Sequence, residues 1–179
     1  HKHCEVEILE SWKQPDLWNF KLHIAVAPTK NMDRMEWFVE KATEIGIDSI
    51  TCLNCRFSER KEIKPARLEK ILVSAMKQSQ KAILPTLTGM TDFKTFVNQP
   101  FYGRKFIAHC EDGDKQLLKQ IYKPGENALI LIGPEGDFSP EEIALALQNG
   151  FEPISLGESR LRTETAALVA CHTIHVLNQ

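Results

Sequence analysis

Two glycine-containing loops hold the residues of this sequence that are best suited to bind a ligand. Residues 133–137 (GPEGD) and 157–162 (GESRLR) each follow a short apolar segment and precede a segment that begins like a helix. Their backbone N–H groups lie outside the expected sheet and helices, so they could bind an adenine edge, ribose hydroxyls or a carboxylate. Ile132, Leu156 and Leu161 would supply apolar walls, which suits a nucleoside. Spacing alone leaves open that both loops are ordinary connections.

Short buried strands are predicted directly before both loops. They are residues 128–132 (ALILI) and 153–156 (PISL). Ser139, followed by Pro140, is typical of a helix start, and Thr163 is the expected N-cap of an alanine-rich helix after the second loop. In open α/β sheets, loops that leave the ends of nearby strands form ligand crevices. Neither loop has the Gly-Lys-Ser/Thr ending of a P-loop or a G-x-G-x-x-G run, which disfavours a phosphate cradle.

Strand and helix patterns alternate from Leu22 to the end of the sequence. The other expected strands are residues 22–27, 48–53, 84–87 and 105–110. The other expected helices are residues 35–46, 65–78, 92–97 and 115–122. This alternation predicts an α/β fold with a mostly parallel sheet covered by helices on both faces. Residues 4–10 (CEVEILE) alternate like a further strand, and a linker over residues 12–20 predicts a domain boundary near Phe20.

The composition is that of an ordinary globular domain. The chain of 179 residues is 42% hydrophobic and 26% charged. No apolar run approaches the roughly 20 residues that cross a bilayer, and no signal peptide precedes the first element. A soluble, cytoplasmic protein is therefore expected.

The cysteines and histidines suggest neither a disulfide framework nor a metal centre. Five cysteines without a secretion signal favour reduced thiols. Cys52 and Cys55 form a C-x-x-C pair, for which two cysteines at a strand end are the simpler interpretation and a thiol redox role is the alternative. His172 and His175 share a helix face without a third ligand, so no metal site is expected.

A local basic patch is the candidate for nucleic-acid contact. The formal net charge of −2 excludes a globally basic nucleic-acid binder. Residues 56–81, however, hold eight basic and three acidic residues, a local net charge of +5. The patch could contact RNA or be a solvated helix face, and its charge leaves both interpretations open.

Three ordered segments resemble the signature motifs of the RsmE-like ribosomal RNA methyltransferases, which belong to the SPOUT superfamily. They are residues 132–142 (IGPEGDFSPEE), residues 156–166 (LGESRLRTETA), and residues 33–37 (DRMEW) followed by 41–46 (KATEIG). The resemblance covers roughly residue 22 to the end of the chain. It implies a SPOUT methyltransferase domain over residues 21–179 with a deep trefoil knot at its C-terminal end. It also implies that residues 1–20 are the remnant of a truncated PUA-like β-barrel domain and its linker.

The resemblance further implies S-adenosylmethionine as the cofactor and methylation of N3 of one uridine in 16S ribosomal RNA of the small subunit. The positions carried over as cofactor contacts are Ile132, Gly133, Pro134, Glu135, Gly136, Leu156, Gly157, Leu161, Arg162, Thr163, Thr165 and Ala166. The expected RNA contacts are Arg34, Arg56, Arg60, Lys61, Lys64, Arg67, Lys77 and Lys81.

The implied reaction assigns roles to three charged residues. N3 of uridine is a weak acid, so its proton must be removed and the charge on the uracil carbonyl oxygens stabilised. An arginine donates two hydrogen bonds and stays cationic, which makes Arg162 the first candidate and Arg160 the second. Glu164 could accept the proton, or it could be a first-turn acid favoured by the helix dipole. Both interpretations of Glu164 remain open.

Three positions depart from the family pattern. Asp137 replaces the usual glycine of the GPEGG motif, Lys77 stands where an acidic residue is common, and Lys81 replaces an arginine. An alternative hypothesis is a non-catalytic RNA-binding module that keeps the fold without cofactor affinity. The presence of Gly157, Arg162 and Glu164 favours the enzyme.

The C-terminal helix suggests a homodimer. Residues 166–177 are apolar almost all the way round the expected helix, whereas its own sheet can cover only one side. Ala166, Ala167 and Ala170 would permit close approach by another helix. A second subunit is the expected cover, and the resemblance agrees, since SPOUT proteins commonly dimerise through this helix.

Overall fold

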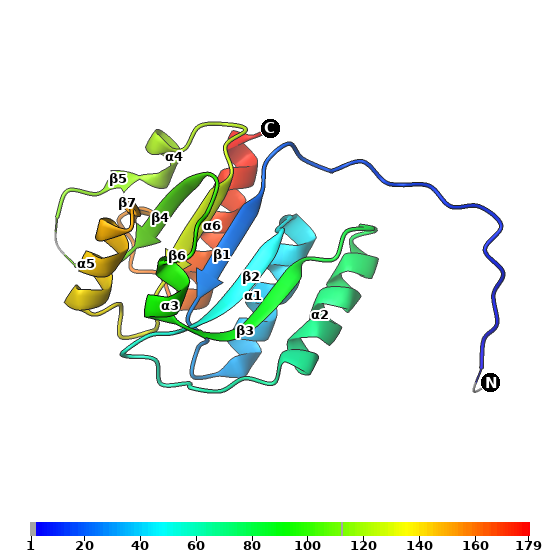
Figure 1. Ribbon diagram of the computed structural model, residues 1–179, viewed down its shortest axis with the longest axis horizontal. Coiled ribbons are helices and arrows are strands. Elements are labelled where there is room, and N and C mark those ends of the chain that lie inside the picture. The colour runs from blue at the N-terminus through cyan, green and yellow to red at the C-terminus, as the bar shows by residue number, and fades with distance from the viewer. Residues whose placement is uncertain (1–2, 112) are drawn as a thin grey trace.

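A seven-stranded parallel sheet forms the centre of the molecule (Figure 1). The computed structural model describes residues 3–111 and 113–179. The strands are β1 (Leu22–Val26), β2 (Ser49–Asn54), β3 (Thr86–Asp92), β4 (Arg104–Ala108), β5 (Gln116–Leu117), β6 (Ala128–Ile132) and β7 (Glu152–Ser155). Their order across the sheet is β3-β2-β1-β6-β4-β7-β5, and every adjacent pair is parallel.

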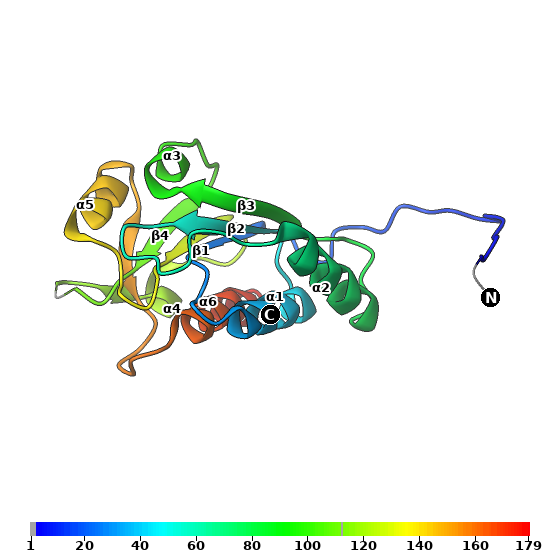
Figure 2. The ribbon, with the colours of Figure 1, turned by 90° about the horizontal axis from the view of Figure 1, so that it is seen from below.

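Helices cover both faces of this sheet, which confirms the predicted α/β class. They are α1 (Met32–Ile45), α2 (Pro65–Gln78), α3 (Phe93–Val97), α4 (Leu118–Ile121), α5 (Pro140–Gln148) and α6 (Thr163–Leu177). Figure 2 shows α1, α2, α4 and α6 on one side of the sheet and α3 and α5 on the other. Within the described ranges, no helix is both long and apolar enough to cross a membrane.

The uninterrupted apolar run of β6 reflects its place in the middle of the sheet. All five of its residues are buried, because β1 and β4 pair with it on either side and helices cover both faces. On β1, Leu22, Ile24 and Val26 contribute to the core beneath α1 and α6. Ala25, and Ala27 just after the strand, contribute to the core on the side of α3 and α5. Two hydrophobic layers therefore fix the position of the sheet.

Three predicted segments differ from the structure. Residues 3–20 contain no helix or strand, so the strand predicted for residues 4–10 is wrong. Its alternating side chains are exposed, and a strand needs a neighbour for its backbone hydrogen bonds. The extended piece predicted at 84–87 only overlaps the beginning of β3, which runs from Thr86 to Asp92. The helix predicted for 115–122 is shorter, because Gln116 and Leu117 pair with β7 as β5.

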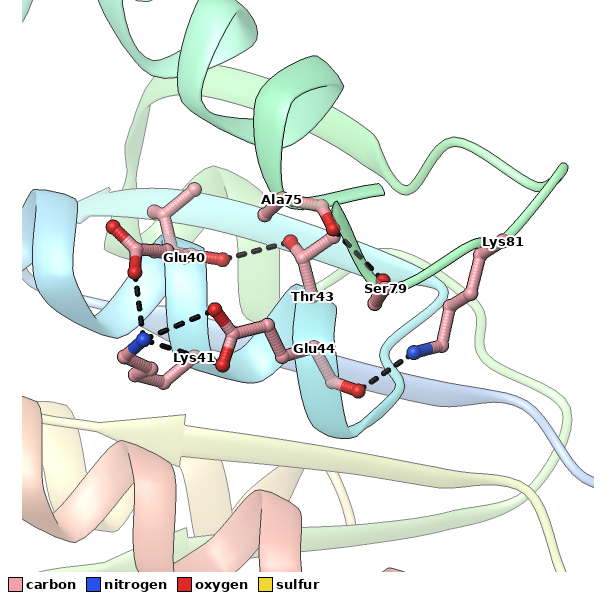
Figure 3. A network of polar contacts seen from close by, with 8 residues as sticks. Glu40, Lys41, Thr43, Glu44, Ala75, Ser79 and Lys81 are labelled. Carbon is pink, nitrogen blue, oxygen red and sulfur yellow. Dashed lines mark hydrogen bonds and ion pairs between the residues drawn. The ribbon is translucent and has the colours of Figure 1, made fainter. Parts of the chain in front are cut away.

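Polar contacts stabilise the carboxyl ends of α1 and α2, and one of them links the two helices (Figure 3). The ammonium group of Lys81 donates to the backbone oxygen of Glu44 at 2.6 Å, and the hydroxyl of Ser79 donates to the oxygen of Ala75 at 2.8 Å. Burial lowers the pKa of Lys81. Because the last carbonyl groups of a helix lack partners within it, Lys81 stabilises the carboxyl end of α1.

Gly46 ends α1 where three parts of the chain meet. Its φ is +138°, a conformation that side chains disfavour, and its amide donates to Ala42 at 2.8 Å. His175 of α6 hydrogen-bonds the oxygen of Gly46 at 2.7 Å. A Cβ atom on Gly46 would lie 2.6 Å from Cε1 of His175 and 2.9 Å from the ring of Trp18. The position thus requires glycine for both conformation and space.

We expect Gly46→Ala to lower the free energy of unfolding by about 2 to 4 kcal/mol, because the new methyl group adds backbone strain and overlaps two rings. Gly89→Ala is the matched control, since a Cβ there would meet only Pro65 Cγ at 3.7 Å and the backbone is unstrained. Its effect should stay below about 1 kcal/mol. Urea unfolding of both variants measures the difference, and equal midpoints would contradict this account of Gly46.

A second prediction concerns acid stability and His23 of β1. Its Nε2 atom lies 2.9 Å from Thr51 Oγ1, and burial lowers the pKa of the ring from 6.5 to about 4. Between these pH values the unfolded chain binds the proton more readily. Stability is therefore complete above pH 6.5 and falls towards pH 4, by at most about 3 kcal/mol from this group. His23→Gln should flatten the fall measured by urea unfolding, and an unchanged pH profile would refute the assignment.

Candidate functional site

A cavity of about 730 Å³ opens where β4, β6 and β7 end. The lining segments are residues 108–110, 132–137 and 154–163, together with Lys115 and Ala166. The two loops that the sequence singled out therefore lie on one cavity. Because β4 pairs with both β6 and β7 in parallel, the carboxyl ends of all three strands reach the same edge (Figure 1).

Thr163 joins the two loops, although not as the predicted helix cap. Arg162 is the N-cap residue of α6, its side chain makes no capping bond, and Thr163 is the first helical residue. The hydroxyl of Thr163 is buried and donates to the backbone oxygen of Gly133 at 3.1 Å. The Thr163 hydroxyl is therefore a donor to the first loop and does not cap α6. This bond holds the start of α6 against the end of β6.

The first loop is held by contacts with neighbouring segments. Oε1 of Glu135 accepts a hydrogen bond from the amide of Lys30 at 2.9 Å, so this carboxylate binds the chain before α1. A Cβ at Gly133 would lie 3.1 Å from the Phe138 ring, and one at Gly136 would lie 3.3 Å from Phe57. Small residues are needed here because other parts of the chain pack closely over the loop.

The second loop is more open. Gly157 has a φ of +127°, and its amide donates to the Ser155 hydroxyl at 3.2 Å. Arg160 and Arg162 line the cavity and are exposed, and no described side chain or backbone group binds either guanidinium group. Both cations are thus available to a ligand. Leu156 and Leu161 are partly buried and add apolar lining.

Glu164 and Thr165 do not line the cavity. The Glu164 side chain is only 8% exposed and lies near α1, where its Oε1 atom is 3.8 Å from Nε of Arg34. Its Oε2 atom is buried without a hydrogen-bond partner among the residues that the structure describes. Glu164 is therefore not brought together with the arginines of the second loop.

The basic patch is spread along α2 and the segments on either side of it. Lys61 and Lys64 precede the helix, whereas Lys77 and Lys81 lie at or beyond its last turn, about 20 Å away for a helix of this length. Several of the cations are also bound within the protein. Arg60 donates to the oxygens of Thr29 at 3.2 Å and Lys30 at 2.7 Å, Arg67 pairs with Glu36 at 2.5 Å, and Lys61 donates to Cys55 at 3.2 Å.

The cavity includes residues at the end of β4 that the sequence did not single out. They are Ala108, His109 and Cys110, with Lys115 beside them. The Lys115 ammonium donates to the oxygen of His109 at 2.8 Å. Burial, and then the charge of Lys115, lowers the pKa of His109. No motif marks this segment, and it joins the site because the strand order places β4 between β6 and β7.

The C-x-x-C pair is buried in the core. Cys52 lies on β2 and Cys55 directly follows that strand. Burial raises the pKa of Cys52 to about 12 and that of Cys55 higher still. A reactive cysteine needs an accessible thiolate, so the thiol redox hypothesis is wrong.

The chain has close relatives among known proteins. The model of the RNA methyltransferase domain family matches residues 16–175. Ribosomal RNA small subunit methyltransferase E of Buchnera aphidicola is 30% identical over 178 residues, covering 96% of this chain and 68% of the relative. The protein of that name from Synechocystis is 28% identical, covering 98% of this chain and 59% of the relative.

Solved structures agree with these matches. A probable rRNA-methyltransferase from Porphyromonas gingivalis is 48% identical with a TM-score of 0.87, covering 94% of this chain and 71% of its own. A methyltransferase from Legionella pneumophila, solved with its cofactor SAM bound, is 32% identical with a TM-score of 0.80, covering 88% and 66%. With a family model spanning most of its length, and the motif loops lining one cavity, the chain belongs to the RNA methyltransferase domain family.

Proposed function

We propose that this protein is an S-adenosylmethionine-dependent methyltransferase that modifies N3 of one uridine in 16S ribosomal RNA. The observation that carries the proposal is the single cavity lined by both motif loops. The names of the relatives support ribosomal RNA of the small subunit as substrate, and the SAM-bound Legionella structure supports the cofactor.

The residues of the cavity fit this cofactor. Its volume of about 730 Å³ lies within the range of small-molecule sites, and its lining combines apolar side chains with loop backbone. We assign cofactor contacts to Ile132, Gly133, Pro134, Glu135, Gly136, Leu156, Gly157, Leu161, Arg162, Thr163 and Ala166, all of which line the cavity. Thr165 lies outside it and is left out of this assignment. When bound, S-adenosylmethionine supplies an electrophilic methyl group.

The chemical roles follow from exposure and charge. Arg162, and secondarily Arg160, would donate hydrogen bonds to the uracil carbonyl oxygens as N3 loses its proton, because both guanidinium groups are exposed on the cavity. For Glu164 we propose a structural role beside Arg34, because its carboxylate is buried against α1. Arg56 and Lys64, both exposed, are proposed to contact RNA.

Two architectural features complete the proposal. After β7 the chain turns back under the sheet, so that α6 packs against α1 and β1, and this return supports a C-terminal knot. The chain spans 59 to 71% of the length of the relatives described above. As the motif resemblance implies, we propose that residues 21–179 form the methyltransferase domain. The same resemblance implies that residues 1–20 belong to a PUA-like domain and its linker.

The proposed activity predicts heat on titration with S-adenosylhomocysteine and label transfer from S-adenosylmethionine to a uridine N3 of unmethylated small subunits. Arg162→Ala should slow transfer about 100-fold, the usual loss for a group that stabilises charge in the transition state, while binding of S-adenosylhomocysteine falls much less. Single-turnover rates and calorimetry separate the two effects. Wild-type rates in this variant would remove Arg162 from the reaction, and no heat with the wild type would favour the non-catalytic RNA-binding alternative.

We also infer that the protein is a homodimer formed through α6. Val176 is 50% exposed, and Leu168 and Val169 are only partly buried, so an apolar row of this helix lacks cover within the described chain. Small residues nearby would allow a second helix to approach closely. The proposal rests on this uncovered row.

Val169→Asp should therefore give a monomer by light scattering, because burying an unpaired carboxylate at the interface would cost several kcal/mol. The variant should also bind S-adenosylhomocysteine more weakly. Leu147→Asp is the matched control, since Leu147 is an apolar residue of α5, 43% exposed, on the other side of the sheet. It should leave both properties unchanged. A monomeric wild type would refute the dimer, and normal ligand binding by a monomeric variant would refute the coupling.

A further inference from the structure

We propose that Asp137 is a positioning residue whose carboxylate holds the backbone just after β4 and thereby fixes one wall of the cavity. The inference deepens the proposed cofactor site and rests on it. It concerns the position at which this chain departs from the family's GPEGG motif.

The backbone at Asp137 is strained. Its φ is +65°, and in the part of the chain that the structure describes only one other non-glycine residue, Gln80, has a positive φ. The amide of Asp137 donates to the oxygen of Pro134 at 2.9 Å, so Asp137 is the last residue of a tight turn. For a residue with a side chain the conformation costs on the order of 1 kcal/mol, which glycine avoids.

The side chain makes a contact that glycine could not make. Oδ2 of Asp137 accepts a hydrogen bond from the amide of Cys110 at 2.7 Å. The ladder between β4 and β6 ends just before this point, at the pair Ala108 and Ile132. The carboxylate therefore links the segments that follow β4 and β6 beyond the end of the sheet. Hydrogen bonds to ionised groups are among the stronger ones in proteins.

Lys115 also holds this segment by hydrogen bonds. Its ammonium donates to the backbone oxygens of His109 at 2.8 Å and Glu111 at 2.5 Å. The backbone around Cys110 is thus held through its amide by Asp137 and through its carbonyl groups by Lys115. His109, Cys110, Lys115 and Asp137 all line the cavity, so these bonds determine the shape of its wall. A wall fixed before binding spares the ligand the entropy of ordering it.

Two substitutions separate the hydrogen bond from the charge. Asp137→Gly removes the acceptor and the strain, whereas Asp137→Asn keeps an oxygen acceptor and tolerates the conformation but removes the charge. We expect Asp137→Gly to bind S-adenosylhomocysteine about ten-fold more weakly and to exchange the Cys110 amide hydrogen at least about ten-fold faster, without loss of thermal stability. Asp137→Asn, whose neutral oxygen accepts a weaker hydrogen bond, should fall between wild type and Asp137→Gly in both measurements.

Asp114→Asn is the matched control, because Asp114 is an exposed acid near the same segment, and its carboxylate makes no hydrogen bond or ion pair with the residues that the structure describes. It should change neither measurement. If Asp137→Gly leaves the exchange rate of the Cys110 amide unchanged, the proposal that Asp137 holds this segment is overturned. If exchange becomes faster but the affinity for S-adenosylhomocysteine is unchanged, the role of this hydrogen bond in binding is overturned. Weak binding by Asp137→Asn with a protected Cys110 amide would assign the effect to charge instead. Amide exchange is measured without ligand. Failure of the wild type to bind S-adenosylhomocysteine would therefore count against the proposed function, and not against the hydrogen bond between Asp137 and Cys110.

Discussion

The parallel pairing of β6 with both β1 and β4 is the constraint on which the rest of the structure depends. Five buried residues of β6 are hydrogen-bonded on both sides and covered by helices on both faces. The pairing brings the end of β6 to the same edge as the ends of β4 and β7. Without this alignment, the GPEGD loop, the GESRLR loop and the residues after β4 would not share a cavity.

Hydrogen bonds between the first loop and other segments then fix the shape of the site. Thr163 binds Gly133, Glu135 binds Lys30 and Asp137 binds Cys110, in each case with one partner in or beside the first loop. Each bond joins segments at least 27 residues apart in the sequence. The loops therefore reach their positions through contacts within the protein, which favours a site that is largely formed before a ligand enters.

Some basic residues bind groups within the protein, whereas others are exposed on the cavity, and a count of charges does not distinguish the two. Arg67 and Lys81 connect α2 and the segment after it to α1, and Arg60 bonds the chain just before α1. Exposed ion pairs contribute little stability, about 0 to 1 kcal/mol each, so their effect is chiefly to orient segments. Arg160 and Arg162, in contrast, have no protein partner in the described chain and face the cavity. The cations best placed for chemistry lie outside the most basic stretch of the sequence.

The sequence by itself determined the α/β class, most elements and the two loops, because apolar runs, proline, glycine and capping residues act locally. The bounds predicted for α2 and β6 match the structure, since Pro65 starts one helix and β6 is buried along its whole length. Tertiary structure alone decided the strand order, and with it the inclusion of His109 and Cys110 in the cavity. It also turned Thr163 from a helix cap to a partner of Gly133 and directed Glu164 towards α1. Local patterns cannot specify these outcomes, because each depends on a contact with a distant segment of the chain.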